Sequence, residues 1–373
     1  MSVLFDSIEI RGMALRNRFV RSATYDGCAE KNGHVSQKQL RMFEELARGG
    51  VGLIITGITY AHPSGQISVF QNSLASDDCI PGFRRLANTV HNQGAKIVVQ
   101  LFHAGRETAK TFKPQRKQAI APSLVSDDPY FQGPHRAMTE DEIWEIVRSF
   151  GDASRRAREA GLDAVQLHAA HAYLLSQFLS PFANRRADPW GGNLENRLRL
   201  HHEIYRDMRA KVGGDYPILV KIGVEDSFAG GLEFREGKRA AQYLAEWGFD
   251  ALEISSGLRG RGYENSEFRP GINQLEREAY FREWCREIRR SVNVPVMMVG
   301  GLRTFELMEQ VIRNQEADFI SLCRPLIREP GLIDDWKNKD RHRAGCISCN
   351  KCFEALLKGE GLHCVIKKEM EGR

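Results

Sequence analysis

Short, continuously apolar runs alternate with longer amphipathic segments along most of this 373-residue chain. Continuous hydrophobicity, rather than alternation, is typical of parallel strands that are covered on both faces. The apolar runs predict eight strands, at Phe19–Arg21, Val51–Thr56, Lys96–Leu101, Ala164–His168, Ile218–Ile222, Ala251–Ile254, Val296–Val299 and Phe319–Leu322. The amphipathic segments predict seven helices between them, at Gln37–Ala47, Gly82–Gln93, Glu140–Ala160, Glu195–Val212, Arg235–Glu246, Glu278–Ser291 and Thr304–Asn314.

Local signals support these helix boundaries. Thr139 and Glu142 have the spacing of a capping box, and glycines such as Gly161 and Gly248 fall where a left-handed helix end precedes a strand. Eight strands alternating with helices predict a (β/α)8 TIM barrel over residues 1–335, followed by a cysteine-containing C-terminal extension over residues 336–373. An open, doubly wound sheet is the alternative, but no GxGxxG follows an early strand.

The amino-acid composition is that of an ordinary globular protein. Hydrophobic residues make up 42% of the chain and charged residues 27%. The formal charge of +5 is spread along the chain, with no basic block and no run of arginines interleaved with aromatic residues. We therefore expect neither a nucleic-acid surface nor a membrane surface. The N-terminus lacks a basic region followed by a long apolar segment, so a cytoplasmic location is expected.

The ends of the predicted strands carry the chemistry, because barrel enzymes place their reactive groups there. After the fourth strand stand His168, His171 and Tyr173, two imidazoles and a phenol that together would polarise a carbonyl and protonate a product. A lone histidine is more often structural, but this grouping favours a functional role. The other strand ends carry Gln100 and His103, Lys221, Ser255 and Ser256, Gly300 and Gly301, and Cys323 and Arg324.

Two long connections follow strands at this same edge. Thr108–Thr139 contains Pro114, Pro122, Pro129 and Pro134 and is expected to form an excursion beside the barrel mouth. Gly257–Gly271, rich in glycine and arginine, is expected to form a second mobile loop.

Several motifs together resemble the Old Yellow Enzyme family of FMN-dependent oxidoreductases, over about Leu4 to Pro330. They are Leu15-Arg-Asn-Arg-Phe-Val20, Val98-Val-Gln-Leu-Phe-His-Ala-Gly-Arg106, Leu167-His-Ala-Ala-His-Ala-Tyr-Leu-Leu175, Phe178-Leu-Ser-Pro181, Asn184-Arg-Arg, Trp190-Gly-Gly-Asn-Leu-Glu-Asn-Arg197 and Cys323-Arg-Pro325. The resemblance implies FMN as cofactor, NAD(P)H as reductant and a small-molecule enone as substrate. It leaves a homo-oligomer open.

The resemblance also implies roles for individual residues. His168 and His171 would bind a substrate carbonyl or phenolate oxygen, and Tyr173 would donate the proton. Gln100 and Lys221 would contact the flavin ring. The remaining cofactor positions are Ser22, Ala23, Thr24 and Gly57 along the ring, and Gly300, Gly301, Cys323 and Arg324 around the phosphate.

Several of these residues also have an alternative, purely structural interpretation. Gln100 would otherwise satisfy backbone groups, Lys221 would form an ion pair, and Arg324 would pair with a carboxylate such as Asp318. His103 and Arg106 would equally brace a loop.

There are also two alternatives for the whole protein. A zinc-dependent TIM-barrel hydrolase would use His103, His168 and His171 as ligands, and a flavin-binding redox sensor would signal through the terminal cysteines.

Four of the eight cysteines crowd the C-terminal extension, at Cys346, Cys349, Cys352 and Cys364. They are similar to the [4Fe–4S] motif of the 2,4-dienoyl-CoA reductase and trimethylamine dehydrogenase branch, but two residues instead of three separate the second and third cysteines. A cluster, zinc and unmetallated thiols stay open. Members of that branch continue into a second half that receives the electrons, whereas this chain ends at Arg373, so NAD(P)H is expected to bind directly over the FMN.

Two positions depart from the family pattern. Tyr25 stands where relatives often carry a threonine or cysteine that tunes the flavin, so it is expected to narrow the site or shift the reduction potential. Trp190 replaces a common tyrosine, and we expect it to have a packing role.

Overall fold

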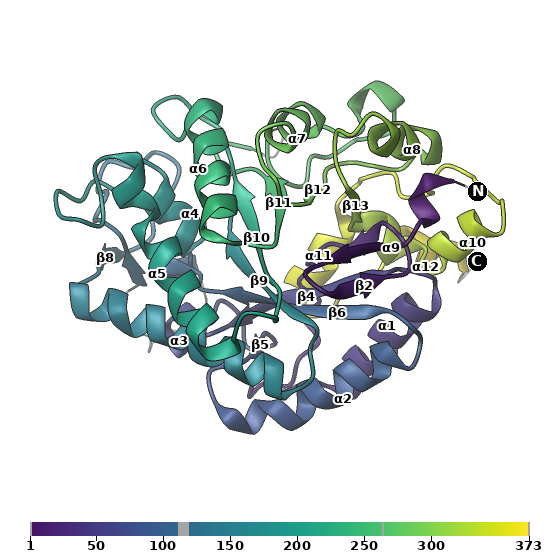
Figure 1. Cartoon of the computed structure of the whole chain (residues 1–373), viewed down its shortest axis with the longest axis horizontal. Helices are drawn as coiled ribbons and strands as arrows, with labels where there is room; N and C mark the ends of the chain where they lie inside the picture. The colour runs from purple at the N-terminus through teal and green to yellow at the C-terminus, as the bar shows by residue number, and fades with distance from the viewer. Residues whose placement is uncertain (1, 111–118, 263–264, 372–373) are drawn as a thin grey trace.

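A closed barrel of parallel strands forms the centre of the computed structural model, which describes residues 2–110, 119–262 and 265–371 (Figure 1). β3 pairs with both β4 and β13, which closes the ring and excludes the open-sheet alternative. Each predicted strand is present, so the (β/α)8 barrel is confirmed. In ring order the strands are β3 (Phe19–Arg21), β4 (Leu53–Tyr60), β6 (Lys96–Phe102), β9 (Ala164–Ala169), β10 (Ile218–Gly223), β11 (Ala251–Ser255), β12 (Val296–Met298) and β13 (Phe319–Leu322), with β5 (Asn72–Ser73) attached beside β4.

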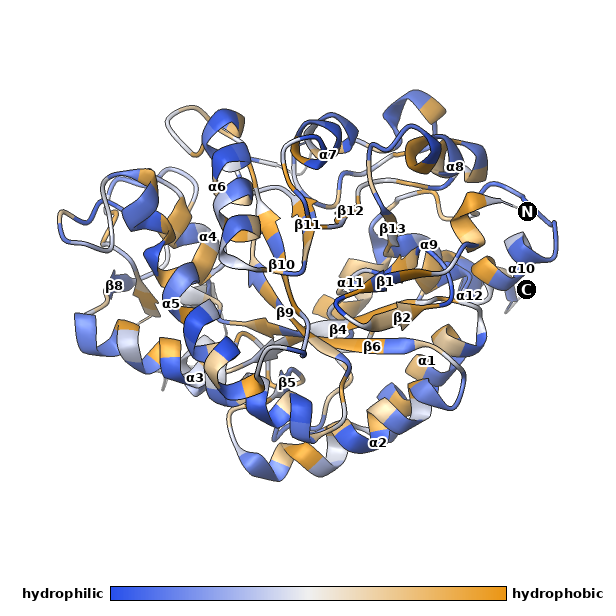
Figure 2. Ribbon diagram, viewed as in Figure 1, coloured by the Kyte–Doolittle hydropathy of each residue, from blue (hydrophilic) through white to orange (hydrophobic). Residues whose placement is uncertain are grey.

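The helices surround this barrel and turn their apolar residues toward it, while their polar residues face outward (Figure 2). The predicted helices correspond to α1 (Gln37–Arg48), α2 (Ile80–His91), α3 (Glu140–Glu159), α5 (Leu194–Val212), α6 (Phe234–Trp247), α7 (Arg282–Arg289) and α8 (Phe305–Arg313). The capping box of α3 is confirmed: the Glu142 N–H donates to Thr139 Oγ1 at 3.3 Å, and the Thr139 N–H donates to Glu142 Oε2 at 2.9 Å.

One helix begins later than predicted. The sequence predicted a helix from Glu278, but α7 starts at Arg282. The Glu278 carboxylate accepts hydrogen bonds from the backbone N–H groups of Arg303 and Thr304, and Ala279 has a φ of +52°. These residues therefore connect two loops instead of extending the helix.

A hairpin that the sequence analysis did not predict closes the amino end of the barrel. It consists of β1 (Ile8–Ile10) and β2 (Met13–Leu15), joined by Arg11 and Gly12, both with positive φ. Its inward residues pack on the first residues of the barrel strands in one buried cluster. Because burial at this end of a TIM barrel serves stability, the chemistry is left to the opposite end.

The chain after β13 continues as α9 (Arg324–Arg328), α10 (Leu332–Lys337), α11 (Lys351–Leu357) and α12 (Val365–Glu371). Backbone hydrogen bonds attach it to the barrel, from Ala344 N–H to the Arg303 carbonyl at 3.0 Å and from Leu362 N–H to the Asp26 carbonyl at 2.9 Å. The division at residue 335 stays a prediction. Within the described part of the chain, no helix combines the length and apolar composition that crossing a bilayer requires.

Candidate active site

The structure brings His168, His171 and Tyr173 together at the carboxyl end of β9. The His168 ring centroid lies 5.0 Å from that of His171 and 5.1 Å from that of Tyr173. A left-handed turn produces this convergence, with φ of +61° at His171 and +65° at Ala172, before α4 (Leu174–Leu179) begins. Two consecutive non-glycine residues in this conformation are strained, and such strain persists where surrounding contacts fix it and often marks a functional site.

Specific hydrogen bonds hold the turn. The His171 N–H donates to the Ser256 carbonyl at 3.1 Å, and Gln177 Nε2 donates to the Ala172 carbonyl at 2.7 Å. The turn is therefore tied both to the end of β11 and to α4. This fixes the directions of the two imidazoles relative to the barrel axis.

Both imidazoles are neutral at physiological pH. Burial lowers the pKa of His168 well below its ordinary value, with the neighbouring His171 and Lys221 acting in the same direction. Burial, then Lys221 and Arg259, likewise lower the pKa of His171. His168 Nδ1 accepts the Ala170 N–H at 3.3 Å, so in the neutral ring the proton resides on Nε2, which can donate to a ligand.

The phenol of Tyr173 is protonated over the same pH range. Burial raises the pKa of Tyr173, and Phe102 packs against its ring with centroids 4.5 Å apart. A phenol that stays protonated near neutral pH is a proton donor. His171 Nε2 lies 2.7 Å from Ser255 Oγ, so the three side chains gather one imidazole donor, a second imidazole held by a serine and a phenol donor at one place.

A partly buried ion pair that the sequence analysis missed lies beside these residues. Arg259 Nε donates to Glu267 Oε1 at 2.9 Å, and the guanidinium carbon lies 5.6 Å from the centre of the Tyr173 ring. Glu267 Oε1 lies 4.0 Å from His171 Nδ1. Both residues belong to the segment Gly257–Gly271, whose arginine-rich composition was the one available signal; residues 263–264, within it, lie outside the described residues.

A second buried network joins the strand ends inside the barrel. Gln100 Nε2 donates to Gln166 Oε1 at 2.7 Å, and Gln166 Nε2 donates to Glu253 Oε2 at 3.0 Å. Ser22 Oγ donates to Glu253 Oε1 at 2.6 Å. Lys221 Nζ donates to Ser22 Oγ at 3.0 Å and lies 3.4 Å from Glu253 Oε1.

Glu253 therefore balances the charge of Lys221, which confirms the ion pair proposed as the rival reading of this lysine. Sequence reasoning passed over Gln166 and Glu253. Their signal was a polar residue in the middle of an otherwise apolar strand, since such a group is buried only with partners.

The other positions expected to contact a ring lie along β3 and β4. Thr24 Oγ1 donates to the Ser22 carbonyl at 2.9 Å and lies 3.1 Å from Cys323 Sγ. Ala23 packs against the cluster at the amino end of the barrel. At Gly57, a Cβ would lie 2.8 Å from the Thr24 carbonyl oxygen, so close passage of the two chain segments already requires glycine there.

Gly300 and Gly301 follow β12 with φ of +122° and +75°. A Cβ at either position would approach the Tyr280 ring to within 2.9 Å, so only glycine fits. Arg324 donates to the Arg269 carbonyl at 2.8 Å and to Asn350 Oδ1 at 2.7 Å. The alternative pairing of Arg324 with Asp318 is wrong, because the Asp318 carboxylate instead forms an ion pair with Arg289 at 2.7 Å.

His103 and Arg106 brace the loops above β6. His103 Nδ1 accepts the Gly105 N–H at 3.0 Å, its Nε2 lies 2.9 Å from Ser64 Oγ, and burial lowers its pKa to about 3. Arg106 forms a buried ion pair of 2.7 Å with Asp128. The described part of the long connection therefore lies beside the barrel mouth, as expected; it contains β7 (Ala119–Ala121) paired with β8 (His135–Ala137), while Pro114 lies outside the described residues.

The geometry does not favour the zinc-hydrolase alternative. In the described ranges, His34, Asp78 and Cys79 form the single group of three such residues whose ligand atoms all lie within 4.8 Å of one another. His103, His168 and His171 do not form such a group. A tetrahedral zinc site needs ligand atoms that converge on one point about 2 Å away.

The structure shows the surroundings of Tyr25 and Trp190, the two residues that depart from the family pattern. Tyr25 Oη donates to Ser68 Oγ at 2.6 Å, and burial raises the pKa of Tyr25 to about 12. Trp190 is buried against Trp144, with ring centroids 5.3 Å apart, which confirms its packing role.

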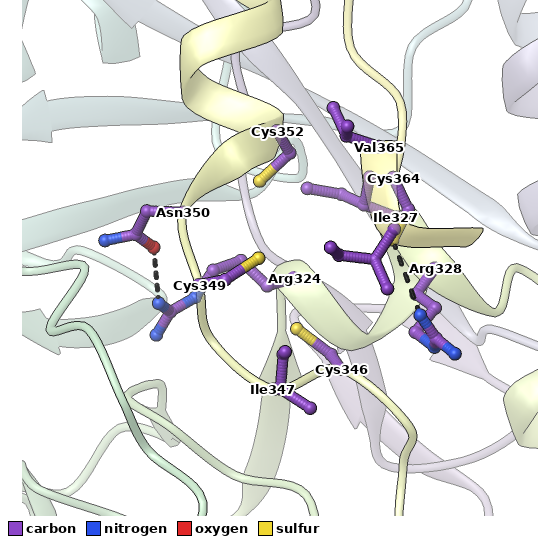
Figure 3. Close-up of a pocket in the computed structure, with 11 residues that line it drawn as sticks. Arg324, Ile327, Arg328, Cys346, Ile347, Cys349, Asn350, Cys352, Cys364 and Val365 are labelled. Carbon is purple, nitrogen blue, oxygen red and sulfur yellow. Dashed lines mark hydrogen bonds between the residues drawn. The ribbon is translucent and has the colours of Figure 1, made fainter. Parts of the chain in front are cut away.

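The four C-terminal cysteines line one pocket, together with Arg324 and apolar side chains (Figure 3). The sulfur atoms of Cys346, Cys349 and Cys352 point into the same space from the 346–349 loop and α11, and Cys364, directly before α12, lines the pocket from the other side. None of the four takes part in a disulfide bond. Burial raises the pKa of Cys346, and burial with neighbouring thiols raises that of Cys352 to about 12.

Comparison with known proteins settles the family. The sequence model of the NADH:flavin oxidoreductase / NADH oxidase family matches residues 3–342. The chain belongs to this family. The resemblance to Old Yellow Enzyme-type oxidoreductases is thereby confirmed, while the link to the dienoyl-CoA reductase branch stays a prediction.

Two kinds of curated relative of this chain differ in length. An NADH oxidase of Thermoanaerobacter brockii is 37% identical over 93% of this chain and 52% of its own, and a metal reductase of Desulforamulus reducens is 32% identical over 99% and 54%. An NADPH dehydrogenase of Halalkalibacterium halodurans is 35% identical over 88% of this chain and 91% of its own. The chain thus spans about half the length of the first two relatives.

Solved structures show the same fold. A 2-naphthoyl-CoA reductase complex superposes with a TM-score of 0.87 at 25% identity, covering 97% of this chain and 56% of that one. An Old Yellow Enzyme homologue from Zymomonas mobilis superposes with a TM-score of 0.73 at 25% identity, covering 90% and 92%.

Membership of the NADH:flavin oxidoreductase family implies FMN and a nicotinamide reductant, and the residues present fit FMN. Ser256 Oγ is buried at the carboxyl end of the barrel without a hydrogen-bond partner among the described residues. An amide at Gln100, an ammonium at Lys221 and a guanidinium at Arg324 supply the donors that a polar ring edge and a phosphate require.

Proposed function

We propose that this protein is an FMN-dependent oxidoreductase that uses NAD(P)H to reduce the C=C bond of α,β-unsaturated carbonyl compounds. The observation that carries the proposal is the convergence of two neutral imidazoles and a protonated phenol, His168, His171 and Tyr173, at the carboxyl end of β9. Family membership supports the cofactor, and the donor set supports the substrate class.

FMN, when bound, supplies hydride transfer from NAD(P)H to the substrate. Gln100 and Lys221 would hold the polar edge of its ring, and Ser22, Ala23, Thr24 and Gly57 would line the ring through close backbone approach. The phosphate would be held by Gly300, Gly301 and Arg324, with Cys323 adjacent. In this role Arg324 would exchange its present contacts with Arg269 and Asn350.

The substrate carbonyl oxygen would accept hydrogen bonds from His168 and His171. Negative charge accumulates on this oxygen as the alkene is reduced, and preorganised donors stabilise such charge most strongly in a buried site. Neutral imidazoles suit this task, because each can donate an N–H hydrogen bond to the oxygen without transferring its proton. Tyr173 Oη–H would then protonate the α-carbon.

The test is Tyr173→Phe. We expect the variant to keep FMN and to be reduced by NAD(P)H at the wild-type rate, but to lose at least 10-fold in the rate of alkene reduction. Anaerobic stopped-flow measurement of the two half-reactions separates these steps, with 2-cyclohexenone as the alkene. Unchanged alkene turnover would remove Tyr173 from the mechanism, and an FMN-loaded wild-type protein without turnover on enones or quinones would favour the redox-sensor alternative.

We also propose that Cys346, Cys349, Cys352 and Cys364 hold a [4Fe–4S] cluster. Their four sulfurs surround one pocket, yet no three of them lie within 4.8 Å of one another in the described chain. Around zinc, sulfurs at 2.3 Å from the metal would stand about 4 Å apart. The wider spacing supports a cubane, which is larger than a single ion.

Iron and acid-labile sulfide analysis of anaerobically purified protein tests this cluster. We expect about four of each per chain, and their loss in Cys349→Ser. Stoichiometric zinc without iron would establish the zinc alternative, and protein that contains neither metal after anaerobic reconstitution would leave the cysteines as thiols.

A further inference from the structure

The positively charged side chain of Arg259 lies over the Tyr173 ring. The guanidinium carbon lies 5.6 Å from the ring centroid, and its positive charge lowers the pKa of the phenol. The loop after β11 carries Arg259, so this residue reaches Tyr173 from a different strand of the barrel.

The loop is anchored so that Arg259 is held in place. Asp226 Oδ1 accepts the Leu258 N–H at 2.6 Å, and Asp226 Oδ2 accepts Ser180 Oγ at 2.6 Å and the Leu232 N–H at 2.8 Å. One buried carboxylate therefore fixes the residue directly before Arg259. On its other side, Glu267 accepts the guanidinium Nε through both carboxylate oxygens, at 2.9 and 3.2 Å.

We propose that Arg259 is a positioning residue that stabilises the phenolate which Tyr173 becomes when it gives its proton to the substrate. This inference rests on the proposed alkene reduction. In that step the Tyr173 O–H bond breaks, and its electron pair stays on Oη. The enolate supplies the electron pair of the new C–H bond at the α-carbon, so a neutral carbonyl product and a phenolate remain, and the phenolate regains a proton from water.

A buried phenolate without a cation would be costly, because a charge in a low-dielectric site is stable only with a partner. Around Tyr173, Glu107 and Glu267 oppose the phenolate, His168 is neutral, and Arg259 favours it. Burial lowers the pKa of Arg259, but Glu267 and Tyr173 raise it further, so the guanidinium stays charged. Arg259 thus lets a partly buried phenol lose its proton and still recover it.

A readout independent of turnover is the ionisation of the phenol itself. A trifluorinated tyrosine placed at position 173 ionises at a lower pH than tyrosine, and its 19F NMR shift reports that ionisation alone. We expect Arg259→Met to move the midpoint upward by at least one pH unit and Arg259→Lys to move it by much less. Arg261→Met, which removes an exposed arginine of the same loop, is the matched control and should leave the midpoint unchanged.

The Glu267→Gln variant distinguishes an electrostatic effect on the Tyr173 phenol from a collapse of the loop that carries Arg259. Removing this carboxylate should lower the ionisation midpoint, because the opposing charge is lost while Arg259 remains. A midpoint that is the same in wild type, Arg259→Met and Glu267→Gln would overturn the proposal. So would an equal upward shift in Arg259→Lys and Arg259→Met, which would mean that packing rather than charge matters.

Kinetics provide the second test. In Arg259→Met we expect alkene reduction to slow about 10-fold, with no change in flavin reduction by NAD(P)H, and no additional loss when Arg259→Met is combined with Tyr173→Phe. Independent, multiplicative losses in the double variant would contradict coupling through the phenol. If the wild-type protein reduces no alkene, the proposed function fails, whereas the NMR titration still decides whether Arg259 controls the phenol.

Discussion

His168, His171 and Tyr173 are ionisable side chains, and all three stay uncharged in their buried surroundings. The same desolvation that lowers the pKa of the histidines raises that of the tyrosine, so all three groups stay uncharged donors. The positive charges nearby, at Lys221 and Arg259, are each paired with a glutamate, Glu253 and Glu267 respectively. The site therefore offers hydrogen bonds to an oxygen that becomes negative, without a permanent net charge.

The histidine pair makes a direct prediction. His168→Ala combined with His171→Ala should reduce the affinity for phenols at least 10-fold, because the phenolate oxygen loses both of its donors. The measurement is titration of FMN-loaded protein with p-chlorophenol, followed by the long-wavelength charge-transfer band. His202→Ala, at a partly buried histidine that stacks on Trp247 on the outside of the barrel, is the control. An undiminished band in the double variant would contradict the paired-donor arrangement.

These three side chains were predictable because they lie within six residues of one another, so one strand end brings them together. The residues around them were not. Glu253 and Gln166 meet Lys221 and Gln100 across neighbouring strands, and Arg259 meets Tyr173 from another loop. Such pairings depend on barrel register and loop path, which the local pattern of one sequence does not encode.

Among the elements, the barrel strands follow the hydrophobic pattern closely, because each is a continuous apolar run buried on both faces. The pattern fails where an element is short or where a polar contact replaces a turn of helix. The three-residue strands of the amino-terminal hairpin are too short to show a period, and the Glu278 carboxylate ends the region that the pattern extended into α7.

The start of α3 carries a pH-dependent prediction. The Arg136 guanidinium, at 2.5 and 2.8 Å, lowers the pKa of Glu142 to about 2, and the capping box adds the Thr139 N–H. Because the folded pKa lies below the unfolded one, this stabilisation is complete above about pH 4.5 and is lost as the pH falls toward 2.

Glu142→Gln should therefore lower the free energy of unfolding by about 1 kcal/mol at pH 7, and the difference from wild type should shrink as the pH is lowered to 4. Urea unfolding at both pH values measures this. Asp141→Asn removes a charge from the same turn but no cap, and its effect should be smaller. A difference for Glu142→Gln that grows toward pH 4 would contradict the assignment.

For the molecule as a whole, the two ends of the barrel have different tasks. The hairpin closes the amino end with apolar side chains, whereas the carboxyl end gathers the polar networks. The cysteine pocket lies next to this working end, since Arg324, separated from β13 by Cys323 alone, also lines the pocket (Figure 3). The family match ends at residue 342, before the cysteines, so the pocket was recognisable only from cysteine spacing.

An anaerobic UV–visible spectrum of freshly purified protein, before and after addition of NAD(P)H, tests whether FMN and its reductant act at this barrel mouth. We expect flavin peaks that bleach on reduction, with a residual broad shoulder near ~400 nm from the iron–sulfur cluster. A colourless protein that cannot be reconstituted with FMN would contradict the account.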